Sequence, residues 1–246
     1  MKRFVTALVL ALAAASALAQ DVDRILRELD ELGDFGGRDF SAVYTIVSQK
    51  PGEKDSVTQV RMFRRDQKDQ FTMVILLPAV NKGQGYLREE DNVWFYDPTS
   101  REFSFSSIKE NIQDSEAKNS DLTLRGFRDD YEVVGTREGT LGKVAVWVIE
   151  LKARTTDVPY ERLTLHVRKD RTALLKEEAY SVSGRLMRTT YYPKYVELAG
   201  KLVPSQILIV DELNPGEKSQ LTMTEQSTAT LPDRVFTKAF LEEVNK

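Results

Sequence analysis

The sequence has 246 residues with 35 basic and 38 acidic side chains, one histidine and no cysteine, for a formal net charge of −3. The lack of cysteine excludes disulfides, a cysteine nucleophile, a cysteine-rich zinc site and a lipobox cysteine that could carry an acyl anchor. The slight acidic excess argues against nucleic acid and anionic lipid headgroups as primary partners.

Residues 1–19 are typical of a secretory signal peptide. Lys2 and Arg3 precede an apolar run, and the A-x-A cleavage motif 17–19 stands before Gln20. We expect cleavage after Ala19, a periplasmic location, and one folded domain over residues 20–246. The apolar run is shorter than the roughly 18 to 20 residues that a membrane helix needs, and no later segment approaches that length.

The mature chain is expected to open with one short amphipathic helix over residues 21–32. Gly33 stands where a helix end favours a positive φ. The apolar residues before it follow helical spacing: Val22, Ile25, Leu26, Leu29 and Leu32.

From Phe40 onward the apolar period changes from helical spacing to two, which predicts strands. Segments rich in Val, Ile, Thr, Tyr and Phe are separated by turn signals such as Lys50-Pro51-Gly52 and Asn214-Pro215-Gly216. The pattern predicts antiparallel strands at residues 39–49, 56–65, 69–77, 84–89, 92–97, 102–106, 130–137, 143–153, 160–169, 173–182, 185–197, 203–213 and 217–228.

Two segments interrupt this meander. In residues 107–120, Ile108 and Ile112 share one face of a short helix expected over 107–113. At the C-terminus, Thr237 is expected to cap a helix whose Phe240, Leu241 and Val244 face inward. The fold class is therefore mainly β: a curved antiparallel sheet forming an incomplete, half-open barrel, with short helices as its lid or plug.

Residues with catalytic potential are sparse. His166 lies on the polar side of an alternating run and is interpreted as a surface strand residue. Acidic pairs such as Glu177-Glu178 lie at expected strand ends and turns, where charge is mostly solvated, and no nucleophile elbow or phosphate loop is present. We expect no catalytic residue, no metal and no cofactor.

Both faces of several strands are apolar, which exceeds the need of a sheet covered on one side. An ordinary core filled by the helices is one explanation, and a cavity for an apolar ligand is the other. The cavity hypothesis selects one parity on each strand: Tyr44, Ile46, Val60, Met62, Met73, Ile75, Trp94, Tyr96, Trp147, Ile149, Ile207 and Ile209. The opposite parity, with Val74, Leu76 and Phe95, is the alternative lining.

A family resemblance supports the cavity hypothesis. The segment Asn92-Val93-Trp94-Phe95-Tyr96-Asp97-Pro98 resembles the central hairpin of periplasmic lipoprotein carriers of the LolA type. The motifs at 77–87 and 120–123, with the ending Leu231-Pro232-Asp233-Arg234-Val235-Phe236-Thr237, resemble the outer membrane lipoprotein-sorting proteins over nearly the whole mature chain.

This resemblance implies a LolA/LolB-like half-barrel that carries the acyl chains of lipoproteins or lipids and is not an enzyme. It implies an inner-membrane transporter as donor and an outer-membrane acceptor. Two other hypotheses remain: a non-catalytic adaptor subunit of an envelope export complex, and an enzyme acting on envelope lipid or glycan. Bound lipid would distinguish the carrier from the adaptor.

Overall fold

The computed structural model describes residues 21–89, 92–124, 126–156 and 158–244. The expected signal peptide, its cleavage site and Gln20 lie outside the described residues. In the described part of the chain, no helix combines the length and the apolar character that crossing a bilayer would require.

One 13-stranded antiparallel sheet forms the molecule, in the order β6-β5-β4-β3-β2-β1-β13-β12-β11-β10-β9-β8-β7. The strands are β1 (Phe40–Gln49), β2 (Ser56–Arg65), β3 (Gln70–Leu77), β4 (Gly85–Glu89), β5 (Asn92–Asp97), β6 (Glu102–Ser106), β7 (Tyr131–Leu141), β8 (Val144–Ala153), β9 (Arg162–Arg168), β10 (Leu174–Tyr180), β11 (Leu186–Leu198), β12 (Lys201–Asp211) and β13 (Lys218–Ser227). Short helical turns connect them: η1 (Asp66–Lys68), η2 (Ala79–Asn81), η3 (Asn119–Leu122), α2 (Phe127–Asp130) and η4 (Asp233–Phe236).

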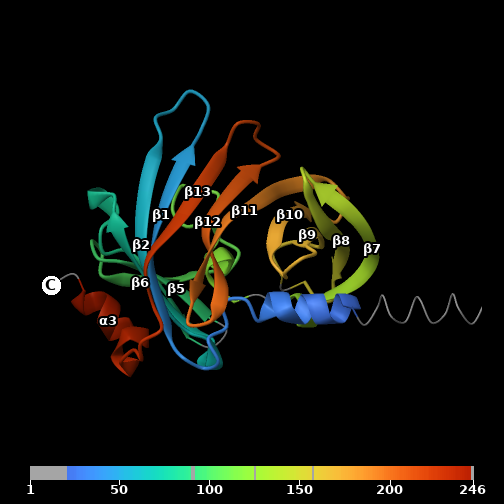
Figure 1. Cartoon of the computed structure of the whole chain (residues 1–246). Helices are drawn as coiled ribbons and strands as arrows, with labels where there is room; N and C mark the ends of the chain where they lie inside the picture. The colour runs from blue at the N-terminus through green and yellow to red at the C-terminus, as the bar shows by residue number, and fades with distance from the viewer. Residues whose placement is uncertain (1–20, 90–91, 125, 157, 245–246) are drawn as a thin grey trace, which may run out of the picture.

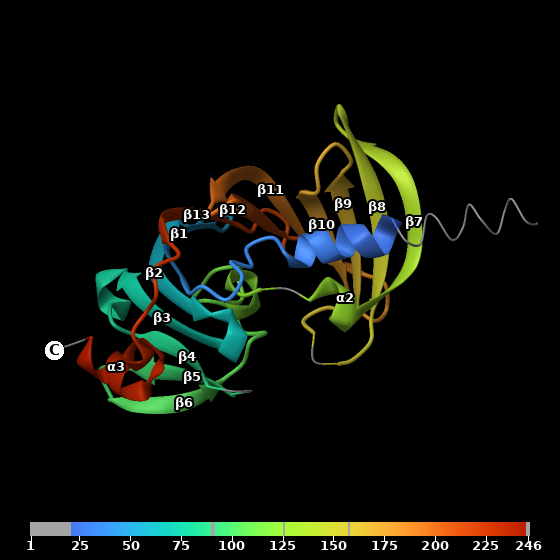
Figure 2. The same cartoon turned by 60° about the horizontal axis from the view of Figure 1, so that its bottom comes forward.

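The sheet curls around a concave side but does not close (Figures 1 and 2). Strand β1 pairs with β2 on one side and with β13 on the other, so the first and last strands of the chain meet at the middle of the sheet. From there the strand order runs outward to β6 and β7, which are its two ends. The predicted fold class, an open curved antiparallel sheet with short helices, is therefore confirmed.

Period-two alternation explains why these segments are strands with one buried face. In β2, Thr58, Val60, Met62 and Arg64 are all buried, whereas the residues between them are less covered. The chain then reverses through η1, and Asp69 follows with a left-handed φ of 50°. Side chains of one parity along each strand thus build one continuous apolar core on the concave side.

The N-terminal helix, described over residues 21–30, lies across the concave side of the sheet near β7 to β10 (Figure 2). Most of its predicted apolar stripe is confirmed, because Val22, Ile25, Leu26 and Leu29 are at most 5% exposed. The helix ends before the predicted residue 32, and Leu32 is half-buried in the turn that follows. Gly33 follows with φ of 78°, as the helix end requires.

The C-terminal helix α3 (Lys238–Glu243) covers the outer face of the sheet instead of its concave side (Figure 1). Thr237 caps it, as predicted, by accepting a hydrogen bond from the Phe240 amide at 3.3 Å. Leu241 is fully buried in a second cluster on this outer face, but Val244 is 43% exposed, so the inward position predicted for Val244 is wrong.

Candidate functional site

A folded segment, residues 107–124, occupies part of the concave side and is called the plug below. The short helix expected over 107–113 is wrong: the backbone forms turns closed by a bridge between Asn111 and Lys118. Asn, Asp and Ser side chains in this segment favour turns over helix, because they bond locally to the backbone. Ser115, for example, accepts a hydrogen bond from the Ala117 amide.

The plug is anchored in the core. Ile112 and Ala117 are fully buried and Leu122 is 2% exposed, all in the same core cluster as the sheet residues. The Glu116 amide donates to Ser219 Oγ of β13 at 2.9 Å. The few apolar residues of the plug therefore bury more area than their number in the sequence indicates.

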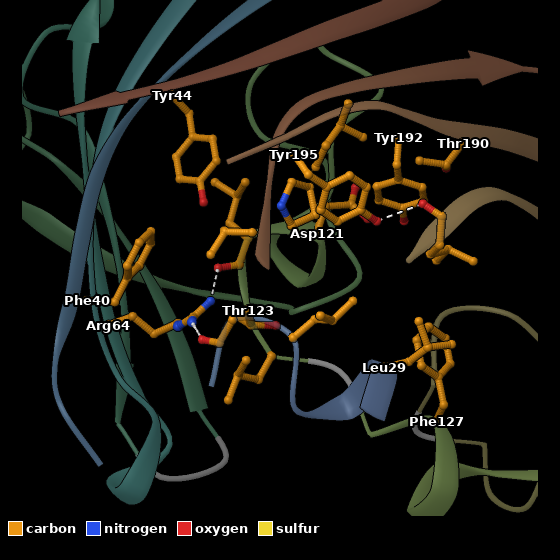
Figure 3. Close-up of a pocket in the computed structure, with 18 of the residues that line it drawn as sticks. Leu29, Phe40, Tyr44, Arg64, Asp121, Thr123, Phe127, Thr190, Tyr192 and Tyr195 are labelled. Atoms are coloured by element: carbon orange, nitrogen blue, oxygen red, sulfur yellow. Dashed lines mark hydrogen bonds between the residues drawn. The ribbon is translucent and has the colours of Figure 1, made fainter. Parts of the chain in front are cut away.

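The plug leaves an apolar cavity of about 110 Å³ between itself, the N-terminal helix and the sheet (Figure 3). We call it the interior cavity; among its lining residues are Leu29, Phe40, Leu122, Leu174, Tyr192 and Ile207. The Tyr44 hydroxyl points into it (Figure 3), and burial raises the pKa of Tyr44 to about 12. On the other side of the plug, near β9 and β10, lies a second cavity of about 260 Å³.

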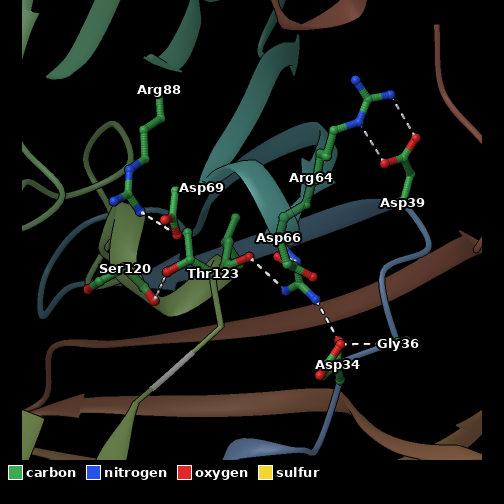
Figure 4. Close-up of polar contacts among 12 residues, drawn as sticks. Asp34, Gly36, Asp39, Arg64, Asp66, Asp69, Arg88, Ser120 and Thr123 are labelled. Atoms are coloured by element: carbon green, nitrogen blue, oxygen red, sulfur yellow. Dashed lines mark hydrogen bonds and ion pairs between the residues drawn. The ribbon is translucent and has the colours of Figure 1, made fainter. Parts of the chain in front are cut away.

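Arg64 of β2 holds both the plug and the end of the N-terminal helix against the sheet. Its Nη2 donates to the carbonyl oxygen of Gly33 at 2.7 Å, and its Nη1 donates to that of Leu122 at 3.4 Å (Figures 3 and 4). Its Nε lies 2.7 Å from Asp66 Oδ1, and the guanidinium stacks over the Phe40 ring at 4.9 Å. One buried cation thus links the end of the N-terminal helix and the plug to the same strand.

Arg188 of β11 makes the second such link. Its Nη2 donates to Asp121 Oδ1 at 2.7 Å and its Nε donates to Thr190 Oγ1 at 3.0 Å. The side chains of Arg188 and Asp121 are 6% and 5% exposed. The other Asp121 oxygen accepts from the Lys118 amide at 2.7 Å, so this carboxylate both shapes the plug and ties it to the sheet.

Asp30, at the end of the N-terminal helix, caps α2. Its carboxylate accepts hydrogen bonds from the amides of Phe127 at 2.7 Å and Arg128 at 3.1 Å. Burial raises the pKa of Asp30 to about 6, although these two amides favour its charged form. The N-terminal helix and the segment after the plug are therefore coupled through one titratable group.

Other polar groups carry no evident chemistry. Glu116, Asp211 and Glu217 place carboxylate oxygens within 4.8 Å of one another, but Asp211 already accepts from the amides of Leu213 and Asn214 in a turn. His166 lies on the outer face, opposite the apolar residues of its strand as predicted, and its Nε2 is 3.2 Å from Glu178 Oε2. Its side chain is only 14% exposed, so it is more covered than the surface position expected.

The predicted cavity residues separate into three groups. Tyr44 and Ile207 line the interior cavity. Trp147 packs against the margin of the core that surrounds the cavity. The others are fully buried in that core: Ile46, Val60, Met62, Met73, Ile75, Ile149 and Ile209.

Trp94 and Tyr96 are not brought together with the rest. Tyr96 belongs to the outer cluster under α3, and Lys238 Nζ of α3 lies 3.7 Å from the centre of the Trp94 ring. On β5, it is Val93 and Phe95 that belong to the concave core. The predicted choice of cavity-facing residues is wrong on β5, because both faces of this strand are covered, one by the concave core and one by α3.

The two buried arginines were missed by the sequence analysis. Their signal was present: Arg64 has the same parity as Val60 and Met62, so the alternation alone places it on the core face. In β11, Arg188 similarly shares a face with the buried Thr190 and Tyr192.

Comparisons with known proteins agree with this architecture. A LolA superfamily protein from Nitrosomonas europaea is 26% identical, with a TM-score of 0.77, covering 89% of this chain and 98% of that one. A DUF1329 family protein from Desulfovibrio piger is 17% identical with a TM-score of 0.78, over the same 89% and 98%. A structure described as an outer membrane lipoprotein-sorting protein domain, from Vibrio parahaemolyticus, is 18% identical with a TM-score of 0.75, again over 89% and 98%.

No protein of curated function matches the sequence. A family model described only as that of an uncharacterized protein matches residues 67–243. The resemblance expected from the motifs is confirmed: the chain belongs to the family of that model, and it matches the LolA superfamily in structure over 89% of its length.

Proposed function

We propose that this protein carries acyl chains of lipoproteins or lipids through the periplasm, inside the concave side of its sheet, without catalysing a reaction. One observation supports this most: the apolar concave side is filled by segments of the chain itself, which a few polar contacts hold in place. A carrier needs such an arrangement, because its empty form must hide the apolar surface that its loaded form offers to cargo.

Acyl burial supplies enough free energy for carriage. Each methylene removed from water contributes about 0.8 kcal/mol, or roughly 12 kcal/mol for a chain of about sixteen carbons. The interior cavity of about 110 Å³ is smaller than the roughly 150 Å³ that admits benzene in an engineered protein core. A complete acyl chain that enters the interior cavity therefore displaces the plug or the N-terminal helix, and these segments refill the space when it leaves.

Donor and acceptor follow from the same proposal. Cargo collected from a transporter in the inner membrane would be delivered to an acceptor at the outer membrane. The similarity to the LolA superfamily and to a lipoprotein-sorting domain supports this direction, and the signal peptide expected in residues 1–19 supports the compartment.

Native mass spectrometry of the protein purified from a cell envelope tests the proposal directly. We expect a mass increment that matches an acyl lipid or a lipoprotein, released in organic solvent. Ile207→Trp should fill the interior cavity and lower lipid occupancy, since Ile207 lines that cavity. Val80→Trp is the matched control, because Val80 is 86% exposed on η2. Protein that is consistently free of lipid, and that binds no apolar probe, would instead favour the adaptor hypothesis.

A further inference from the structure

Arg188 lies at the boundary between two cavities of different character. It lines the interior cavity, together with apolar residues such as Leu29 and Ile207. It also lines a cavity of about 600 Å³ whose residues include Asn111 and Ser181, called the polar cavity below. An amphiphile with its tail in the first cavity and its head in the second would place the junction between them at Arg188.

The hydrogen-bonding capacity of Arg188 is not fully used. Nη2 bonds to Asp121 and Nε to Thr190, whereas the buried Nη1 makes no hydrogen bond of normal geometry with the described residues. Tyr160 is the other group beside this guanidinium, with its ring centre 5.9 Å from Arg188 Cζ. Buried donors without partners are rare, because each loses its bonds to water. A guanidinium can bind an oxyanion through two nitrogens at once, and Asp121 engages only one of them.

Cargo binding changes what faces this guanidinium. Asp121 belongs to the plug, whereas Arg188 belongs to the sheet. An acyl chain that displaces the plug therefore removes the Asp121 carboxylate and leaves Arg188 in place. Glu177 on β10, opposite Thr190 in register, and Asp211 on β12, opposite Arg188 itself, are carboxylates of the sheet and stay in place. Losing Asp121 still removes a hydrogen-bonded partner of a buried cation, which is costly, so cargo that offers oxygen acceptors at this position is favoured.

We propose, building on the carrier function above, that the cargo is an acyl lipid with an anionic phosphate or carboxylate group, which replaces Asp121 on the guanidinium of Arg188. The acidic excess of the whole chain disfavours an anionic surface as partner, but a single anion inside a cavity meets the local buried cation instead. In the empty protein, the Asp121 carboxylate occupies the place of that group.

The polar cavity is lined by the carboxylates of Glu116, Glu161 and Asp211 and by the cations Lys118 and Arg188. Lys118 already donates to Asn111 and to the Lys109 carbonyl oxygen, whereas Nη1 of Arg188 makes no hydrogen bond of normal geometry with the described residues, so Arg188 is the cation that favours the anion.

Three ligands with the same palmitoyl chain test this inference: lysophosphatidate, palmitate and the neutral monopalmitoylglycerol. Each is titrated against a bound apolar naphthylamine probe that has no charged group. We expect one or both anionic ligands to displace the probe at a concentration lower by about tenfold or more than the neutral ligand. The preferred anion identifies whether phosphate or carboxylate is the natural group.

Variants locate the effect. Arg188→Gln should remove the preference for the anion, and Asp121→Asn should keep the preference and tighten anion binding, because the internal competitor is weakened. Arg168→Gln, which removes a cation paired with Asp170 on the strand end of β9, is the control for net charge.

Two outcomes would overturn the inference in different ways. If monopalmitoylglycerol binds the unaltered protein as tightly as both anions, the anion site is wrong while the carrier function stands, and this holds even if Arg188→Gln does not fold. If none of the three ligands displaces the probe, the carrier function itself fails.

Discussion

At the scale of single residues, buried charge distinguishes this interior from a simple oily core. Arg64 and Arg188 each connect a strand to a segment that fills the concave side. Such links are stable only while both partners are present, since an unpaired buried charge is costly. These links can therefore break and re-form as the segments move, and substituting one partner tests what each link contributes to stability.

Arg64→Met should lower the free energy of unfolding by about 3 to 5 kcal/mol, because Asp66 is left buried without its cation. Burial already raises the pKa of Asp66 despite the pairing. The double variant Arg64→Met with Asp66→Asn should recover part of this loss. Urea denaturation of the two variants measures the difference, and equal losses in both would show that the ion pair is not the cause.

Asp30→Asn should stabilise the protein at pH 7.5. The pKa of the Asp30 carboxyl is raised from 3.8 to about 6, so the folded state binds the proton more tightly than the unfolded state does. The stability linked to that proton is fully present below the unfolded value and is lost as the pH rises through about 6. Since Asp30 is partly exposed, we expect a gain on the order of 1 kcal/mol, or about 2–4 °C in melting temperature.

Thermal melts at pH 7.5 and at pH 4 check this prediction. The advantage of Asp30→Asn should shrink toward zero at the lower pH, where the native carboxyl is itself protonated. Glu243→Gln, which removes an exposed carboxylate on α3, is the control for the loss of one negative charge. A gain that persists unchanged at low pH would contradict the titration of Asp30.

At the scale of elements, local sequence determined most of the fold. Strands such as β2 and β6 begin and end where alternation and turn residues predict, because period two and turn chemistry agree there. The segment at 107–113 was expected to help plug the concave side, but as a helix. Its turn conformation was not predicted, because the spacing of Ile108 and Ile112 fits a helix whereas the turns depend on tertiary contacts such as Glu116 with Ser219. The core face of β5 was also not predictable, because α3 makes the outer face apolar too.

The docking of α3 depends on a glycine. A Cβ at Gly85 of β4 would lie 2.6 Å from Leu241 Cδ2 and 2.7 Å from the carbonyl oxygen of Met73. Gly85→Ala should therefore push α3 from the sheet and lower stability by about 1–3 kcal/mol, as overpacking does. Limited proteolysis near the C-terminus should detect the released helix. If cleavage and stability both match the unaltered protein, α3 does not rely on this close approach.

At the scale of the whole molecule, one continuous sheet surrounds segments that pack on its concave side without joining its strand order. The sheet is continuous from β6 to β7, so the segments on its concave side can move without breaking its ladder of backbone hydrogen bonds. The N-terminal helix and the plug fill the concave side of the sheet. Arg64 and Arg188 join them to the sheet, and Asp30 joins the N-terminal helix to α2. Opening is therefore a local event whose cost is a small set of polar bonds and the apolar area of these segments.

A reversible covalent tether measures whether this opening is needed. The Glu116 amide lies 2.9 Å from Ser219 Oγ, so the plug and β13 are in direct contact here, and a cysteine pair at these two positions is the tether. The chain has no native cysteine, so no other disulfide competes. Oxidation should keep the fold and slow lipid uptake and release strongly, and reduction should restore both.

Fluorescent lipid exchange between vesicles and the tethered protein gives the rate in both redox states. The single variants Glu116→Cys and Ser219→Cys control for the substitutions, including the loss of the bond between Ser219 and Ser48. Because the interior cavity is too small for an acyl chain, the oxidised form can admit cargo there only if another segment moves. Exchange at the same rate in the oxidised and reduced forms would therefore assign opening to the N-terminal helix and remove the plug from the pathway of the lipid.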